Sequence, residues 1–195
     1  MNRTIINPLY QDRVTSTQTS EETGGKITEL DLVLSPKGGN PMHHHTSFEE
    51  TFTAVKGELG LKLKDKTLIL KHGESYTVKR MEGHGFFNPS VSEEIEFNIK
   101  IIPGHTGFEN SLRIMYGLAQ DGLTAKNGIP KDLGVAFWLG ELNDSKVHGF
   151  LFKLLQPLGS FLAKGIKKKG IDQELLNRYC PCLGVVESTL GLGEV

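Results

Sequence analysis

The feature that most constrains the fold is a change in hydrophobic period at Pro103-Gly104. Before this point, apolar and polar residues alternate over short stretches, most regularly across residues 95–101. Alternation with period two is typical of strands that bury one face. After it, apolar residues recur three and four positions apart, which is the pattern of amphipathic helices. The sequence therefore predicts a mainly β unit followed by a helical one.

Short β-favouring stretches recur between residues 10 and 104, and turn-forming residues separate them. We expect strands over residues 27–34, 59–63, 67–70 and 95–101. The strongest turn signal is the Pro-Lys-Gly-Gly stretch at residues 36–39. Many short strands with turns every eight to twelve residues or so favour a β-sandwich or β-barrel.

The remainder of the chain has the periodicity of several helices. We expect helices over residues 108–118, 132–142, 150–169 and 171–179, the third of them kinked or broken at Pro157. Asp172 and Glu174 in the first turn favour the start of the last helix. We therefore divide the chain into a β-barrel domain, residues 1–104, and a helical C-terminal extension, residues 105–195.

Composition and charge narrow the class of protein. Of 195 residues, 37% are hydrophobic and 23% charged, which favours a packed core over disorder. A net charge of −1 creates no field that attracts nucleic acid, so we expect no nucleic-acid partner. The N-terminus lacks a signal-peptide pattern. Cys180 and Cys182 are too close for an unstrained disulfide and too few for a structural zinc site, so we expect free thiols and a cytoplasmic protein.

Three consecutive histidines, His43, His44 and His45, are followed by Glu50. Imidazole nitrogen and carboxylate oxygen suit borderline divalent metals. On an extended chain His43 and His45 project to the same side and can reach one ion, while His44 points away. Glu50 shares its strand face with apolar residues, where a metal would compensate its charge. By themselves, however, the histidines are equally compatible with a polar surface loop, and Glu50 with a solvated strand residue.

The spacing around these residues forms a recognisable motif. His43 and His45 are separated by one residue, Glu50 follows after four more, and Gly57 after a further six. A second segment places Gly73 before a histidine at 84 and an asparagine at 88. In both spacing and residue type, the two segments resemble the two motifs of the cupin superfamily. The resemblance covers roughly residues 25–104.

The chain departs from the cupin pattern at three positions. Lys37 stands where the first motif opens with glycine, and Gly38 follows it. Lys79 and Met81 occupy the proline and glycine positions of the second motif. We therefore expect the loop before His84 to differ in shape from its usual form.

The resemblance implies a jelly-roll β-barrel with a metal ion inside that faces an open end. It also implies that His43, His45, Glu50 and His84 are the ligands, and that the protein forms a homodimer. One divalent transition metal is expected, and iron, manganese, nickel, copper and zinc all suit these ligands. Asn88 is interpreted as a turn-former.

Two functions fit such a site. The first is a metal-dependent enzyme with dioxygenase-like oxidoreductase chemistry. Its substrate is expected to be a small, partly apolar molecule, because several phenylalanines and leucines suggest an apolar cavity: Phe52, Phe86, Phe87, Leu59, Leu61 and Leu63. The alternative is a non-catalytic module that binds or senses a small molecule. No catalytic residue is assigned, although Tyr76 is worth testing, as is Glu49, which we interpret as solvent-facing.

The extension carries an apolar surface beside a lysine cluster. Its apolar members are Phe150, Leu151, Leu154, Leu155, Leu158, Phe161 and Leu162, and its lysines are Lys164, Lys167, Lys168 and Lys169. Such a surface can bind an anionic membrane. We favour the simpler interpretation that it packs on the barrel or on a second subunit.

Overall fold

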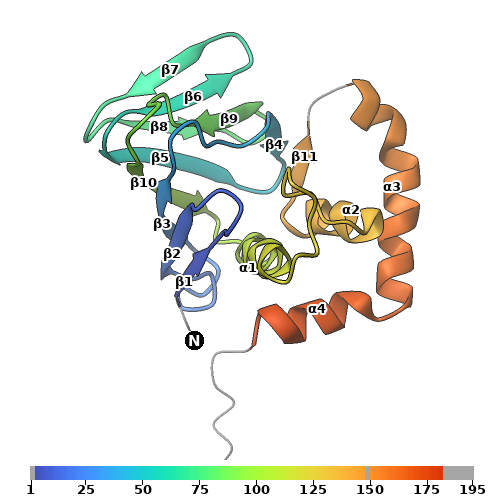
Figure 1. The fold of residues 1–195 in the computed structure, drawn as a ribbon. Coiled ribbons are helices and arrows are strands. Elements are labelled where there is room, and N and C mark those ends of the chain that lie inside the picture. Colours follow the sequence, from blue (N-terminus) through green and yellow to red (C-terminus); the bar gives the residue numbers. More distant parts are fainter. Residues whose placement is uncertain (1–2, 148–149, 182–195) are drawn as a thin grey trace, which may run out of the picture.

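A computed structural model describes residues 3–147 and 150–181, with side chains described for residues 3–146 and 157–181 (Figure 1). Cys182 lies outside the described residues. So do the side chains of Phe150, Leu151, Leu154 and Leu155, which belong to the apolar surface expected on the extension.

Two antiparallel sheets form the β part of the molecule. The first has the order β1-β2-β3-β10-β5-β8. Its strands are β1 (Thr4–Ile6), β2 (Arg13–Gln18), β3 (Thr28–Leu34), β10 (Ile95–Ile102), β5 (Glu49–Lys56) and β8 (Ser75–Val78). The second has the order β11-β4-β9-β6-β7. Its strands are β11 (Ser145–Val147), β4 (His43–His45), β9 (His84–Phe87), β6 (Leu59–Leu63) and β7 (Thr67–Leu70).

Alternating side chains of both sheets build one hydrophobic core. In β10, every second residue from Ile95 to Ile101 is no more than 2% exposed. Phe52 of β5 and Leu61 of β6 face the same core, so the two sheets bury a common interior. This arrangement confirms the mainly β fold with a helical C-terminal part, because the period-two pattern does bury one face of β3 and of β10.

The four predicted helices are confirmed, with ends that differ by a few residues at most. They are α1 (Thr106–Gln120), α2 (Leu133–Leu142), α3 (Phe150–Lys168) and α4 (Ile171–Tyr179). Helix α3 continues through Pro157 and is not broken there. Two strands lie outside residues 10–104, the part of the chain expected to form strands: β1 near the N-terminus, and β11 between α2 and α3. Strands β2, β8 and β9 lie within that part but had not been predicted individually.

Helix α1 lies between the sheets and the other helices, as Figure 1 shows. Phe108 and Tyr116 belong to the core of the sheets, whereas Ile114 and Leu118 belong to a second core with α2, α3 and α4. At Gly107 a Cβ atom would overlap the carbonyl oxygen of Leu142. Only glycine therefore allows the start of α1 to approach the end of α2 this closely, and this approach brings the segment after α2 to the sheets.

Helix α3 has a buried side and an exposed side. Ala163 and Ile166 are buried against the helical core, at 0% and 5% exposure. Leu158 and Phe161 are exposed to 54% and 72%. Within the described part of the chain, no helix has the length and apolar character needed to cross a membrane.

Candidate metal centre

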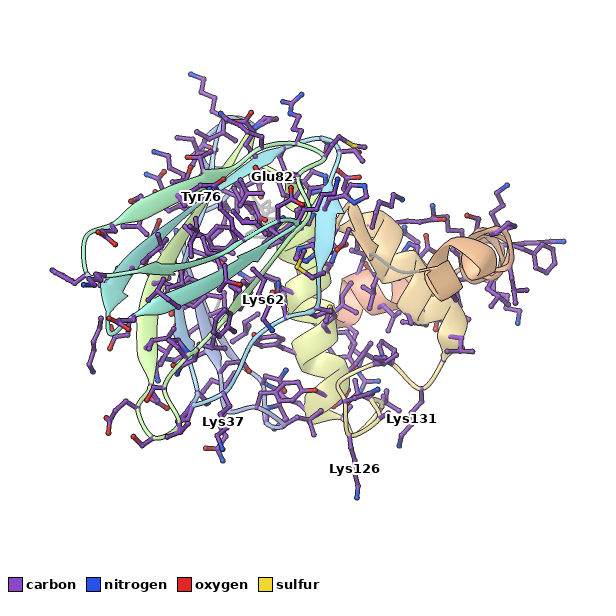
Figure 2. The ribbon with its side chains drawn as sticks, turned by 90° about the horizontal axis from the view of Figure 1, so that it is seen from above. Lys37, Lys62, Tyr76, Glu82, Lys126 and Lys131 are labelled. Atoms are coloured by element: carbon purple, nitrogen blue, oxygen red, sulfur yellow. The ribbon has the colours of Figure 1, made fainter. Side chains whose placement is uncertain are left out.

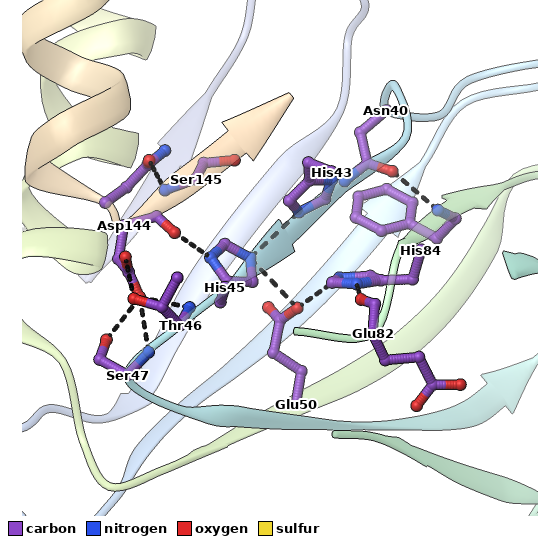
Figure 3. A network of polar contacts seen from close by, with 12 residues as sticks. Asn40, His43, His45, Thr46, Ser47, Glu50, Glu82, His84, Asp144 and Ser145 are labelled. Atoms are coloured by element: carbon purple, nitrogen blue, oxygen red, sulfur yellow. Dashed lines mark hydrogen bonds and ion pairs between the residues drawn. The ribbon is translucent and has the colours of Figure 1, made fainter. Parts of the chain in front are cut away.

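Four side chains from three strands converge at one end of the second sheet (Figure 3). His43 and His45 come from β4, His84 from β9 and Glu50 from β5 of the facing sheet. Each residue is 1–8% exposed. One potential ligand atom of each lies within 4.8 Å of those of the other three. The structure thus brings together all four residues that the sequence singled out, as a buried cluster that fits a metal site.

The pairing of β4 with β9 places the histidines side by side. His43 is in register with His84. The turn before β4 approaches β9 so closely that a Cβ on Gly39 would lie 2.6 Å from the carbonyl oxygen of Phe86, so only glycine fits. The Asn40 side-chain oxygen accepts a hydrogen bond from the Phe86 amide at 2.7 Å and fixes the same approach.

Alternation along β4 separates the three histidines as predicted. His43 and His45 are buried, and His44 between them is half-buried. His44 is in register with Lys146 of β11, whereas the side chains of His43 and His45 contact each other. The two expected ligands therefore occupy one face of the strand, because successive side chains in a strand point to opposite sides.

Backbone carbonyls fix the orientation of all three imidazole rings. In each ring Nδ1 lies within hydrogen-bond distance of a carbonyl oxygen, which can only accept a proton. A neutral ring held in this way carries its proton on Nδ1 and has a free electron pair on Nε2. The three pairs are His43 with Pro41 at 2.9 Å, His45 with Asp144 at 3.1 Å and His84 with Glu82 at 3.0 Å.

The electron pairs of the four side chains consequently point at one another. Nε2 of His43 lies 3.0 Å from Nε2 of His45. Oε2 of Glu50 lies 2.7 Å from Nε2 of His84 and 3.4 Å from Nε2 of His45. Four converging acceptors in a buried position repel one another unless a proton or a cation lies between them. These four ligand atoms therefore fit a divalent cation.

The pKa shifts agree with this assignment. Burial and, to a smaller extent, the neighbouring His84 lower the pKa of His43 to about 4, so His43 is neutral at pH 7. For Glu50 burial raises the pKa, but the neighbouring imidazole rings of His45 and His84 outweigh it and lower the pKa, so the carboxyl stays ionised. Burial lowers the pKa of His84, and the contact with Glu50 more than offsets this and raises it. A proton on His84 can thus balance Glu50 in the metal-free protein, and a metal would displace it.

At two of the three departures from the cupin pattern, the backbone has the φ angle that glycine commonly adopts. Lys37 and Met81, which stand at glycine positions of the motifs, have φ angles of 61° and 66°. This left-handed conformation is the one that glycine adopts without strain. Lys79, at the proline position, donates its backbone N–H to the Glu82 carboxylate at 3.0 Å, a bond that proline cannot make. The expected change of loop shape is therefore not visible in the backbone angle of Met81.

Aromatic rings flank the cluster on two sides. Phe48 stacks on the His45 ring with a centroid separation of 4.3 Å. Phe52 lies 5.9 Å from the His84 ring and 6.1 Å from Phe86. Phe87, in contrast, covers Gly60 on the outer face of the sheet, where the ammonium group of Lys62 lies 5.1 Å from its ring. Phe87 is thus not part of the apolar interior suggested by the sequence.

Two surface pockets lie away from the cluster. A pocket of about 280 Å³ lies between the β6–β7 turn and the loop that precedes His84. A second, of about 120 Å³, lies over β3, β5 and β10. None of the four clustered side chains lines either pocket. An open barrel end beside the metal, as the resemblance implied, is not evident from these two pockets.

The other residues singled out in the sequence have structural contacts. The hydroxyl of Tyr76 donates to Glu82 at 3.1 Å. Figure 2 labels both residues on the side of the molecule formed by the sheets. Glu49 pairs with Lys79 at 3.0 Å at the surface. Asn88 is buried, and its amide group donates to three backbone carbonyls of neighbouring turns, which agrees with its interpretation as a turn-former.

The carbonyl groups that hold the histidine rings had not been predicted from the sequence. Those of Pro41 and Glu82 lie two residues from the histidines they contact, so the local turns around the motif could have suggested them. Asp144 lies 99 residues away from His45. No pattern in the sequence connects these two residues.

Comparison with known proteins finds one family match and several similar solved structures. Residues 31–97 match the family described as "Cupin domain". Among curated protein sequences, no relative matches the chain. Similar solved structures include an RmlC-like cupin from Shewanella frigidimarina, with 13% identity, a TM-score of 0.45 and coverage of 53% of this chain and 86% of that one.

Two further structures are similar over about half of this chain. A predicted oxalate decarboxylase from Thermotoga maritima is 20% identical, with a TM-score of 0.45 and coverage of 47% of this chain and 80% of that one. The polyketide cyclase RemF from Streptomyces resistomycificus is 22% identical, with a TM-score of 0.43 and coverage of 49% and 68%.

Proposed function

Through residues 31–97 this chain belongs to the cupin superfamily, and on that premise we propose that it is a metal-dependent enzyme. Its chemistry is that of a dioxygenase-like oxidoreductase, and its substrate is a small, partly apolar organic molecule. The observation that supports the proposal is the convergence of three Nε2 atoms and one carboxylate oxygen in a buried position.

The proposed ligands are His43, His45, Glu50 and His84, which would hold one ion of iron, manganese, nickel, copper or zinc. A five- or six-coordinate ion with four protein ligands keeps one or two positions open, and it would supply Lewis-acid or redox chemistry there. Three neutral imidazoles and one carboxylate leave a divalent centre with one net positive charge. That charge favours a substrate that presents an oxygen anion or another electron-rich atom.

The protein's own residues prepare the site in two ways. The carbonyl groups on the Nδ1 side hold the rings so that every Nε2 faces the centre, which limits reorganisation on metal binding. The rings of Phe48 and Phe52 lie against two of the histidines and exclude water. An apolar environment of this kind strengthens electrostatic interactions at the metal and favours a partly apolar substrate.

The burial of the cluster favours a second candidate function. The four side chains are no more than 8% exposed, and neither pocket described above includes them. An ion that no substrate can reach would not be catalytic, and the chain would then be a non-catalytic module that binds or senses a small molecule. Such a module would bind its ligand without converting it.

Oxygen uptake separates the two functions. Tag-free protein is loaded in turn with Fe²⁺, Mn²⁺, Ni²⁺, Cu²⁺ and Zn²⁺ and mixed with a panel of small phenols, enols and aromatic carboxylates. We expect substrate-dependent oxygen consumption with at least one redox-active metal, and its loss in His84→Ala. Turnover that is undiminished in a folded His84→Ala protein would contradict the proposal. Compounds that raise the melting temperature and are never consumed would favour the binding module.

A further inference from the structure

The helical extension reaches the candidate metal centre at His45. We propose that Asp144 is a positioning residue that holds the imidazole ring of His45 in its ligating orientation. This inference rests on the proposed metal site and adds a component that lies outside the cupin segment, residues 31–97. The extension is thereby assigned a role in building the site.

Asp144 contacts His45 and the loop that follows it, as Figure 3 shows. Its backbone oxygen accepts a hydrogen bond from Nδ1 of His45 at 3.1 Å. Its carboxylate oxygen Oδ2 accepts from the backbone amides of Thr46 and Ser47, each at 2.7 Å. The hydroxyls of Thr46 and Ser47 donate to Oδ1 at 2.8 Å and to Oδ2 at 2.7 Å. One residue thus fixes both the His45 ring and the two residues after it.

Strand β11 holds Asp144 in this place. Ser145 and Val147 of β11 pair with His45 and His43 of β4. Without β11, β4 would be the edge strand of its sheet, with the backbone groups on one side unpaired. The extension therefore covers the free edge of the strand that carries two of the four proposed ligands.

The three histidines differ in the source of their support. His43 and His84 are held by carbonyls two residues away, within the same turns of the cupin segment. His45 is held by a carbonyl 99 residues away. The tautomer and ring orientation of His45 consequently depend on the docking of the extension, whereas those of the other two do not.

The backbone of Asp144 shows how its side chain and its carbonyl are linked. Its φ angle is 51°, a conformation that non-glycine residues seldom adopt, with aspartate and asparagine the usual exceptions. This conformation persists because the carboxylate accepts the four hydrogen bonds from Thr46 and Ser47. Removal of the carboxylate should release the backbone and move the carbonyl away from His45.

The test compares three variants. Asp144→Ala removes the carboxylate, and Asp144→Asn keeps its shape and its tolerance of the left-handed conformation. Asp121→Ala is the matched control, because Asp121 accepts hydrogen bonds from Arg178 and Tyr179 within the extension and contacts none of the proposed ligands. Ring ¹⁵N NMR of the metal-free proteins reports the His45 tautomer. Chelator competition measures the affinity for Zn²⁺, and the Cu²⁺ EPR spectrum reports the geometry of the site.

We expect the Nδ1–H tautomer of His45 in the wild-type protein and a tautomer mixture in Asp144→Ala. We also expect Zn²⁺ affinity about 10–100-fold weaker in Asp144→Ala, the range found for groups that orient metal ligands, together with an altered Cu²⁺ spectrum. Asp144→Asn should keep much of the wild-type tautomer preference and Zn²⁺ affinity. Asp121→Ala should match the wild type in all three measurements.

Distinct outcomes overturn the two proposals. If folded Asp144→Ala keeps the wild-type tautomer, affinity and Cu²⁺ spectrum, the positioning role is wrong and the metal site stands. An equal loss in Asp121→Ala would also overturn the positioning role, since the effect would then be general loosening of the extension. If the wild-type protein binds neither Zn²⁺ nor Cu²⁺ while its His45 tautomer still depends on Asp144, the proposed metal site is wrong and the positioning contact is correct.

Discussion

Replacing His84 with alanine is expected to weaken metal binding by more than about 100-fold. Groups that only orient metal ligands contribute about 10–100-fold to affinity, and the loss of a ligand atom should exceed this. The change also leaves the buried carboxylate of Glu50 without its contact at 2.7 Å. We therefore expect the metal-free variant to be less stable than the wild type, because an uncompensated buried charge is costly. Competition with a chromophoric chelator measures the affinity, and circular dichroism verifies the fold.

His44→Ala is the matched control for this prediction. His44 stands between two of the proposed ligands in the sequence, but it is in register with Lys146 and lies on the other face of β4. Its replacement should leave the affinity within about threefold of the wild type. An equal loss in both variants would mean that the histidine run acts through a general effect on β4 and not through ligation.

The second large effect is expected at Phe52, which lies between the two sheets at 1% exposure. Replacement by alanine removes a large buried ring that packs near His84 and Phe86. Truncations of this kind lower the free energy of unfolding by about 3–5 kcal/mol. Urea denaturation of the metal-free protein, followed by circular dichroism, measures this difference.

Thr53→Ala is the control on the same strand. Thr53 points to the other face of β5, where its hydroxyl lies 2.8 Å from that of Ser75 in an exposed position. We expect a loss of about 1 kcal/mol or less, as for a single surface hydrogen bond. Similar losses in Phe52→Ala and Thr53→Ala would contradict the assignment of Phe52 to the common core of the two sheets.

The cluster could be predicted because two of its histidines lie close together in the sequence and because the other two residues fit a known spacing pattern. His43 and His45 lie two residues apart on a strand, so alternation alone places them on one face. The spacing to Glu50 and the second segment with His84 matched a known pattern, and the structure brings these side chains together. Likewise, the alternation across β10 reports which face of this strand is buried, and this face does belong to the core.

The contribution of the extension could not be predicted because it is non-local. Strand β11 has only three residues, with Lys146 at its centre, and this is too short to show a period. It forms because the edge of β4 is free to pair and because α1 and α2 approach each other at Gly107. Asp144 reaches His45 only through that pairing, so a contact 99 residues apart leaves no trace in the local sequence.

The sequence also could not predict which of the phenylalanines near the motif faces the interior. Phe86 and Phe87 are neighbours of the same type, and only the register of β9 with β6 decides which of them faces the interior. Gly60 leaves space for the Phe87 ring on the outer face of the sheet, and Phe86 packs against Phe97 at 5.2 Å on the inner one. An apolar composition near the motif therefore indicates core packing as much as a substrate cavity.

The buried cluster of His43, His45, Glu50 and His84 is expected to bind a metal ion. The most direct test is the metal content of the tag-free protein, measured by mass spectrometry beside that of the double variant His43→Ala/His84→Ala. We expect about one equivalent of iron, manganese, nickel, copper or zinc per chain in the native protein, and loss of that metal in a folded double variant. Absence of bound metal in the native protein, even after reconstitution with each of the five ions, would contradict it.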